Sequence, residues 1–171
     1  MRTRRLIIVV LLCTLFVGLW LLLRMTPPGY TRIDLTLEGN GNILFSAVLP
    51  DGERVTLTWR NSQFGLDVTE TFFTRSGHLV QDRVTFAAPD GTPPPRVSAK
   101  DVDDLFHTGG AFDARGLSKP FTRIVYRIGE IGNPKLQVQN KTISFKKEAG
   151  FGGRVILTTV RPAFHEMIFR R

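Results

Sequence analysis

The chain has 171 residues, a single cysteine and a formal net charge of +8. This length holds one domain after an N-terminal segment, and not two. Cys13 falls in the first apolar segment, so the rest of the chain has neither a disulfide nor a thiol nucleophile. Four of the 23 Lys and Arg and none of the 15 Asp and Glu precede residue 30, which leaves about +4 after it. This mild excess suits a position near anionic lipid headgroups, whereas no recognition helix or aromatic and basic platform indicates nucleic acid.

An uncharged apolar run, Leu6 to Leu23, opens the chain, with three arginines before it and Arg24 after it. A helix of about 18 residues rising about 1.5 Å each is roughly 27 Å long, enough to cross a thin bilayer. Because the arginines are concentrated before the run, the positive-inside rule keeps the N-terminus in the cytoplasm. We therefore expect a basic tip and transmembrane anchor over 1–25, a Pro-rich spacer over 26–29 and a periplasmic domain over 30–171, held in a bacterial inner membrane.

Other interpretations of the apolar run fit less well. A cleavable signal peptide also starts with basic residues, but its apolar core is about 7–15 residues long and ends at small residues. Here Arg24-Met25-Thr26-Pro27-Pro28 follows the run. A buried core helix needs a polar face, and Cys13 lacks the small preceding residue of a lipoprotein site. The retained anchor is the favoured interpretation.

From Tyr30 the apolar period becomes two, which is typical of half-buried strands separated by turns. About eight short strands predict an all-β sandwich or barrel-like domain behind the single transmembrane helix. The expected strands begin at Tyr30 and continue at Ile43–Leu49, Val55–Arg60, Leu66–Thr74, Leu79–Phe86, Phe121–Ile128, Lys135–Gln139, Thr142–Lys146 and Arg154–Val160.

The segments between these strands are expected to be mostly irregular. Residues Ala87–Lys100 are rich in proline and predict a long surface loop. Asp101–Phe106 predicts one helical turn capped by Asp101. Gly109–Pro120 is expected to be irregular, and Phe164–Arg171 is expected to be a basic, partly apolar tail.

One stretch of the chain resembles a known family. After a strand ending at Trp59 come Asn61-Ser62, the acid-bearing strand Val68-Thr-Glu70-Thr-Phe72 and Gly77-His-Leu-Val80. Arg127-Ile-Gly-Glu-Ile-Gly-Asn133 follows further along. Over roughly residues 30–160 this pattern is similar to the bacterial family known as domain of unknown function 1850, whose members also carry a preceding membrane anchor.

The resemblance implies which genes lie nearby rather than a chemical reaction. Genes of this family commonly lie beside tripartite ATP-independent periplasmic (TRAP) transporters of the TAXI type, which use a solute-binding protein and a membrane permease. The chain would then be an accessory or partner of such a transporter. The family usually has His-Ser where this chain has Asn61-Ser62, and two adjacent acids where this chain has Thr69-Glu70. If that histidine and those acids did chemistry, this chain would lack half of the set.

The same residues give two competing expectations for a site. Asn61, Ser62 and Glu70 would line a small polar pocket if their strands bring them together. The alternative is a turn in which Asn61 and Ser62 bond their own backbone while Glu70 holds a strand end. A periplasmic module for a small anion would use arginines such as Arg60, Arg123 or Arg127, whose guanidinium groups suit carboxylates.

The sequence favours a protein that is not an enzyme. Ser62 as the nucleophile of an envelope hydrolase would need a base, and no Gly-x-Ser-x-Gly elbow surrounds it. His78, His107 and His165 lack the close spacing of metal ligands, so each is expected on the surface or in a turn. Asp101, Asp103 and Asp104 lack the glycine and closing glutamate of a calcium loop. No catalytic residue, metal site or cofactor is therefore expected.

Overall fold

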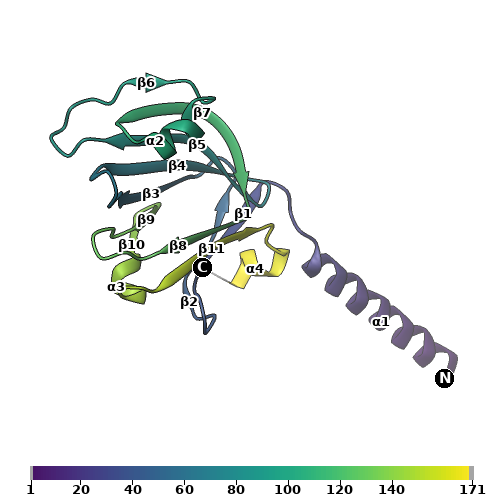
Figure 1. The fold of residues 1–171 in the computed structure, drawn as a ribbon. Coiled ribbons are helices and arrows are strands. Elements are labelled where there is room, and N and C mark those ends of the chain that lie inside the picture. The colour runs from purple at the N-terminus through teal and green to yellow at the C-terminus, as the bar shows by residue number, and fades with distance from the viewer. Residues whose placement is uncertain (1, 170–171) are drawn as a thin grey trace.

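The computed structural model describes residues 2–169, without the side chains of residues 2–6, 23, 168 and 169. A long helix, α1 (Arg2–Arg24), leads into a domain made of two β-sheets (Figure 1). The first sheet has four strands in the order β2-β1-β11-β8, and the second has seven in the order β10-β9-β3-β4-β5-β7-β6. The predicted all-β domain is therefore confirmed. The basic tip at Arg2, Arg4 and Arg5 and the end of the tail at Arg170 and Arg171 lie outside the residues or side chains described.

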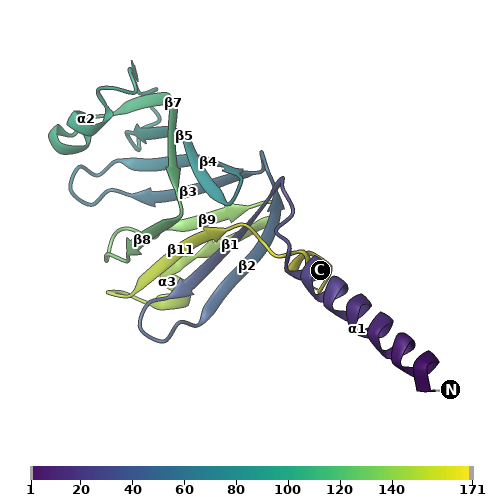
Figure 2. The same cartoon turned by 90° about the vertical axis from the view of Figure 1, so that its right-hand side faces the viewer.

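The strands alternate between buried and partly exposed residues, as half-buried strands do. The strands of the four-stranded sheet are β1 (Tyr30–Leu37), β2 (Ile43–Pro50), β8 (Arg123–Arg127) and β11 (Arg154–Val160). Those of the seven-stranded sheet are β3 (Arg54–Arg60), β4 (Asp67–Arg75), β5 (His78–Ala87), β6 (Arg96–Val97), β7 (Phe112–Phe121), β9 (Lys135–Val138) and β10 (Lys141–Ser144). The two sheets face each other and diverge at the end away from α1 (Figure 2).

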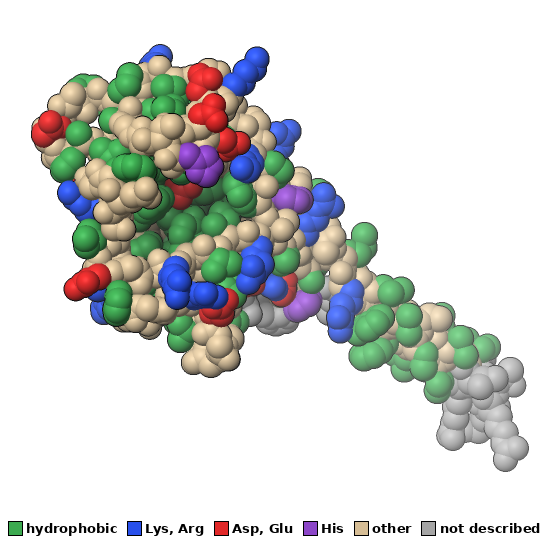
Figure 3. Space-filling view, viewed as in Figure 1, with side chains coloured by type: hydrophobic (Ala, Val, Ile, Leu, Met, Phe, Trp, Pro, Cys, Tyr) green, Lys and Arg blue, Asp and Glu red, His purple; other side chains and the backbone are tan. Residues whose placement is uncertain are grey.

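The hydrophobic core has two parts. The larger cluster lies between the sheets and includes Leu35, Leu57 and Phe72. The smaller cluster includes Val68 and Phe112, and it lies beneath the short helix α2 (Val102–Thr108). Figure 3 shows that the molecule is hollowed between these parts, below α2 and above β8, with mostly hydrophobic side chains on the walls of the hollow.

Strand β7 is the largest departure from the sequence prediction. Gly109–Pro120 was expected to be irregular, but β7 occupies Phe112–Phe121 and pairs with β5 over most of its length. Gly116, with a φ of 72°, interrupts the alternation of apolar residues that would have indicated a strand. The register of the β5–β7 pair also shifts between Gln81 and Arg83, and this bulge hides the strand period.

The helices after residue 25 are short. Helix α2 confirms the predicted helical turn, but Asp101 makes no side-chain capping bond because its own backbone is already helical. The strand expected over Thr142–Lys146 is wrong in its second half: β10 ends at Ser144 and α3 (Phe145–Ala149) follows, because Phe145 turns into the core. The predicted tail contains α4 (Phe164–Phe169).

The C-terminal helix returns to the base of α1. The Phe164 amide donates a hydrogen bond to the Met25 carbonyl oxygen over 2.8 Å, and Arg32 of β1 forms an ion pair with Glu166 of α4. The apolar side chains described between Ile7 and Leu22 are each at least 50% exposed, because α1 extends away from the domain (Figures 1 and 2). Within the part of the chain that the structure describes, no helix has both the length and the apolar character needed to cross a membrane.

Candidate ligand-binding site

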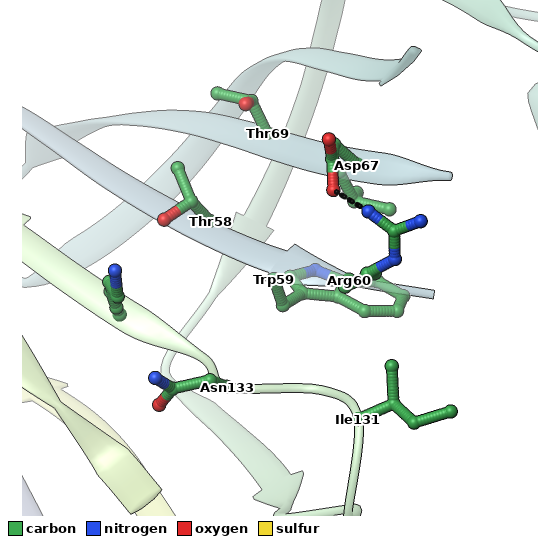
Figure 4. A pocket seen from close by; sticks show the side chains of 9 residues that line it. Thr58, Trp59, Arg60, Asp67, Thr69, Ile131 and Asn133 are labelled. Carbon is green, nitrogen blue, oxygen red and sulfur yellow. Dashed lines mark hydrogen bonds and ion pairs between the residues drawn. The ribbon is translucent and has the colours of Figure 1, made fainter. Parts of the chain in front are cut away.

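A polar pocket lies where β9 ends beside β3 (Figure 4). In the sheet register Thr58 is opposite Lys135, the first residue of β9, so the last residues of β3 have no strand beside them on this edge. The loop before β9 takes that place, and a Cβ atom on its Gly132 would lie 3.2 Å from the Arg60 carbonyl oxygen. The close approach of this loop to the end of β3 closes one side of the pocket.

The pocket has a volume of about 320 Å³ and is lined by residues of three strands, β3, β4 and β9, and of the loop before β9. Thr58 and Thr69 face each other in register on β3 and β4, and their hydroxyl groups form part of the wall. The lining side chains come from Thr58, Trp59, Arg60, Asp67, Val68, Thr69, Ile131, Asn133 and Lys135. Hydroxyl, amide, guanidinium and ammonium groups thus surround one small volume.

The charged groups of the pocket are only partly neutralised. Arg60 Nη1 lies 3.2 Å from Asp67 Oδ1, and both side chains are exposed to solvent, at 41% and 56%. An ion pair this exposed leaves much of the guanidinium free to bind a ligand. Lys135 forms no ion pair with any residue that the structure describes. Asn133 Oδ1 accepts a hydrogen bond from Ser144 Oγ over 2.9 Å, which leaves the amide NH₂ group as a donor.

Asn61 and Ser62 do not lie in this pocket. They belong to the turn between β3 and β4, where Asn61 Oδ1 accepts hydrogen bonds from the backbone amides of Gln63, at 2.9 Å, and Phe64, at 3.0 Å. Ser62 is exposed in the same turn. The structure thus agrees with the alternative in which Asn61 stabilises its own turn, and this turn orders the strand ends that carry Arg60 and Asp67.

Glu70 points into the space between the two sheets rather than toward Asn61 and Ser62. It lies opposite Leu57 in register, about four residues along the strands from Asn61, which is roughly 13 Å. Its Oε1 accepts a hydrogen bond from Gln81 Nε2 over 2.9 Å, and its Oε2 accepts bonds from Trp59 Nε1 at 3.2 Å and Tyr126 OH at 3.4 Å. Glu70 therefore joins β3, β4 and β5 to β8 of the opposite sheet.

Burial determines the protonation of this cluster. It raises the pKa of Glu70 above the ordinary value of 4.5, although the hydrogen bonds from Trp59, Tyr126 and Gln81 favour the carboxylate. Burial, together with the nearby Glu70, also raises the pKa of Tyr126 far above 10. The phenol therefore stays protonated and donates its hydrogen bond to Glu70.

Arg123 and Arg127 lie apart from the other predicted anion contacts. Both are exposed on β8, in the sheet opposite to the one that carries Arg60. Only Arg60 of the three predicted arginines lines the pocket. Lys135, Asn133 and the two threonines were missed because a loop and a strand pairing bring them together; the one signal in the sequence was the alternation that puts Thr58 and Thr69 on the polar side of their strands.

In a second charged cluster on the seven-stranded sheet, the carboxylate of Asp113 is already paired with arginines of the same sheet. Partial burial of Asp113 favours its protonated form, but hydrogen bonds from Arg83, Arg115 and Thr85 outweigh this and lower its pKa. Because two arginines already bind this carboxylate, the cluster is structural.

The described residues include no group of three His, Cys, Asp or Glu side chains that could hold a metal ion. His78 Nδ1 lies 3.1 Å from the Ser76 carbonyl oxygen and is part of a turn. The polar pocket thus contains hydroxyl, amide and charged groups that can form hydrogen bonds with a ligand.

Comparison with known proteins gives no relative. No family model matches the chain, and neither a curated protein nor a solved structure matches it.

Proposed function

We propose that this chain is a membrane-tethered, non-catalytic β-domain that binds a small anionic solute in the polar pocket at the end of β3. One observation carries the proposal: Arg60, Lys135 and the free amide group of Asn133 surround the same volume of about 320 Å³. Guanidinium and ammonium groups form the strongest hydrogen bonds with carboxylates. A volume of this size is at the small end of ligand pockets and therefore suits a small molecule.

The balance of charges suggests the class of solute. Arg60 and Lys135 are cationic and Asp67 is anionic, so the pocket lacks one negative charge. A monocarboxylate supplies that charge, whereas a dicarboxylate would place its second group near Asp67. Thr58 and Thr69 add hydroxyl groups that both donate and accept hydrogen bonds. The proposed solute is therefore a small monocarboxylate that carries a hydroxyl group.

Calorimetric titration of the full chain in detergent tests this proposal, with lactate as the anion and lactamide as its neutral counterpart. Lactate should bind, and Arg60→Gln or Lys135→Gln should weaken it about tenfold or more, because a hydrogen bond to a charged group contributes about 1.5–3 kcal/mol. Arg123→Gln removes the same charge on the opposite sheet and should leave the affinity unchanged. Equal binding of lactamide, or an affinity indifferent to Lys135→Gln, would contradict the proposal.

The location of the domain is part of the proposal. The uncharged run Leu6–Leu23 and the exposed apolar side chains of α1 support a helix that inserts into the bacterial inner membrane. The arginines before the run support a cytoplasmic N-terminus and a periplasmic domain.

A second candidate function is that of an accessory to a TAXI-type TRAP transporter, in contact with the permease or its solute-binding protein. The resemblance of Asn61-Ser62, Glu70 and Arg127–Asn133 to the family known as domain of unknown function 1850 supports it. A domain that holds a carboxylate beside the membrane would suit such a partner, since the two candidates then concern the same solute.

A further inference from the structure

The hollow between α2 and β8 has features of a second binding site (Figure 3). The four-stranded sheet ends at β8, so it covers the larger hydrophobic cluster and leaves the side of the smaller one open. Partly buried apolar side chains pack against both clusters, among them Phe64, Leu105 and Leu117 against the smaller one and Ile124 and Tyr126 of β8 against the larger one. Such a surface can accept an apolar ligand.

Glu70 places a carboxyl group beside this apolar hollow. It occupies an inward position of β4 between Val68 of the smaller cluster and Phe72 of the larger, yet its side chain is only partly buried. The residue as a whole thus keeps some exposure between the sheets, although burial raises the pKa of its carboxyl group. A carboxylate offers about four acceptor positions, and the three hydrogen bonds to Glu70 leave one of them open.

No cation neutralises Glu70. Its three donors, from Trp59, Gln81 and Tyr126, are all uncharged, and among the described residues no Lys, Arg or His forms an ion pair with it. Asp34, Asp113 and Glu166 differ in this respect, since each is paired with arginine. A carboxylate removed from water without a cation is costly.

Aromatic groups surround Glu70. The indole N–H of Trp59 and the phenol O–H of Tyr126 both donate to the carboxylate, so the polar edges of these rings lie against it. Trp59 also packs edge to face on Phe86, with ring centroids 6.1 Å apart, and this contact fixes its ring. The selection of a cation therefore rests on the carboxylate, and the rings supply apolar surface.

We propose that the hollow binds a small organic cation, an ammonium group carried on an apolar chain, with the ammonium against Glu70 and the chain along the aromatic and aliphatic walls. An anion would be repelled by Glu70. A wholly apolar ligand would take the remaining water from the carboxylate and give it no partner in return. The site shares Trp59 with the pocket of Arg60 and Lys135, but it depends on a different charged group, so each proposal can fail without the other.

Tryptophan fluorescence of the full chain in lipid nanodiscs tests the proposal. The chain has two tryptophans, Trp20 and Trp59, so Trp20→Phe leaves Trp59 as the only reporter of the hollow. The probes are n-hexylammonium, hexanol and hexanoate, which share an apolar chain and differ in charge. n-Hexylammonium should change the emission saturably and bind about tenfold more tightly than hexanol. Because Trp59 also lines the polar pocket, hexanoate is tested with Arg60→Gln, which weakens carboxylate binding there, and should then give no response.

Two variants separate the ammonium contact from general apolar binding. Glu70→Gln should weaken n-hexylammonium about tenfold and leave hexanol unchanged, because the amide keeps the size of the side chain and loses its charge. Glu148→Gln removes an equal charge from the exposed surface of α3 and should change neither affinity. Equal responses to all three probes, no saturable response to n-hexylammonium, or an affinity that Glu70→Gln does not alter would overturn the proposal.

A third variant provides a test if Glu70→Gln does not fold. Tyr126→Phe removes one donor from Glu70 and frees another acceptor position on the carboxylate. This variant should bind n-hexylammonium severalfold more tightly, whereas an unchanged or weaker affinity would contradict the assignment of Glu70 as the cation partner.

Discussion

Glu70 shows how far a single residue can be read from the sequence. The alternation Leu66, Val68, Glu70, Phe72 correctly predicts that Glu70 shares a side of its strand with apolar residues. Its partners could not be predicted in the same way, because Gln81 and Tyr126 reach it only through strand pairing and sheet packing. The spacing of Asn61 from Glu70 suggested a shared pocket, but one of them stabilises a turn and the other lies between the sheets.

Glu70 should make the stability of the protein depend on pH. Because its pKa is higher in the folded chain than the ordinary 4.5, folding favours the protonated side chain. The associated stability is complete below pH 4.5 and is lost as the pH rises through the folded pKa. Thermal unfolding of the full chain in detergent should therefore show the wild type losing stability relative to Glu70→Gln as the pH rises from 4.5 toward 7.

Asp113 does not disturb this comparison. Its pKa is lowered from 3.8, so its contribution to stability is present above that pH and is lost only at lower pH, in the variant and the wild type alike. A difference in melting temperature between wild type and Glu70→Gln that stays constant from pH 4 to 7 would contradict the raised pKa of Glu70.

At the scale of elements, the packing of α2 depends on a glycine at its end. Gly109 has a φ of 79°, and a Cβ atom there would lie 2.5 Å from Cε1 of the Phe64 ring. Phe64 belongs to the turn after β3, so this contact joins α2 to the turn that Asn61 stabilises. The smaller hydrophobic cluster is closed by this contact.

Gly109→Ala should therefore destabilise the protein by about 1–3 kcal/mol beyond the cost of its backbone conformation, because the added methyl group overpacks the Phe64 ring. Gly150→Ala is the matched control: Gly150 also ends a helix, its φ of 72° and ψ of 179° are close to the 79° and 177° of Gly109, and a Cβ atom there meets no atom within 4 Å. Chemical denaturation of both variants measures the difference. Equal losses of unfolding free energy would show that the Phe64 contact has no effect on stability.

Most of the strands were predictable from the pattern of apolar residues and turns. Strands β1, β2, β3, β4, β5, β8, β9 and β11 lie within about two residues of their expected bounds. Strand β7 was missed because Gly116 and Pro120 are both unfavourable in strands. Pro120 is tolerated because β6 pairs only with Asp113 and Ala114, so the far part of β7 has a free edge where a missing amide costs little.

At the scale of the whole molecule, the polar pocket depends on strand pairings between distant segments, which the order of residues in the sequence does not reveal. Arg60 could be named from the sequence as an anion contact, yet Lys135 and Asn133 lie more than 70 residues later and enter the pocket only because β9 pairs with β3 and begins at Lys135. The all-β class was predictable from the pattern of strands and turns. The position of Glu70 between the two hydrophobic clusters was not predictable, because it depends on where the four-stranded sheet ends.

The proposed tether and transporter partnership predict the behaviour of the full chain in cells. Because the run Leu6–Leu23 is uncharged, the chain should be found in the membrane fraction and be released by detergent but not by high salt. Mild-detergent purification should recover it with a permease or a solute-binding protein. Recovery in the soluble fraction would contradict the tether, and a purified chain without either transporter subunit would contradict the partnership alone.

The arginines of β8 have a consequence for the approach of a second copy of the chain. Strand β8 is the last strand of its sheet, so among the described residues no strand pairs with its outer edge. Such an edge is a template on which a second copy would add a strand. Arg123 and Arg127 are exposed on this strand at an interval of four residues, so a second copy paired along the same edge would bring like charges close together. Charged side chains on an edge strand thus disfavour edge-to-edge association.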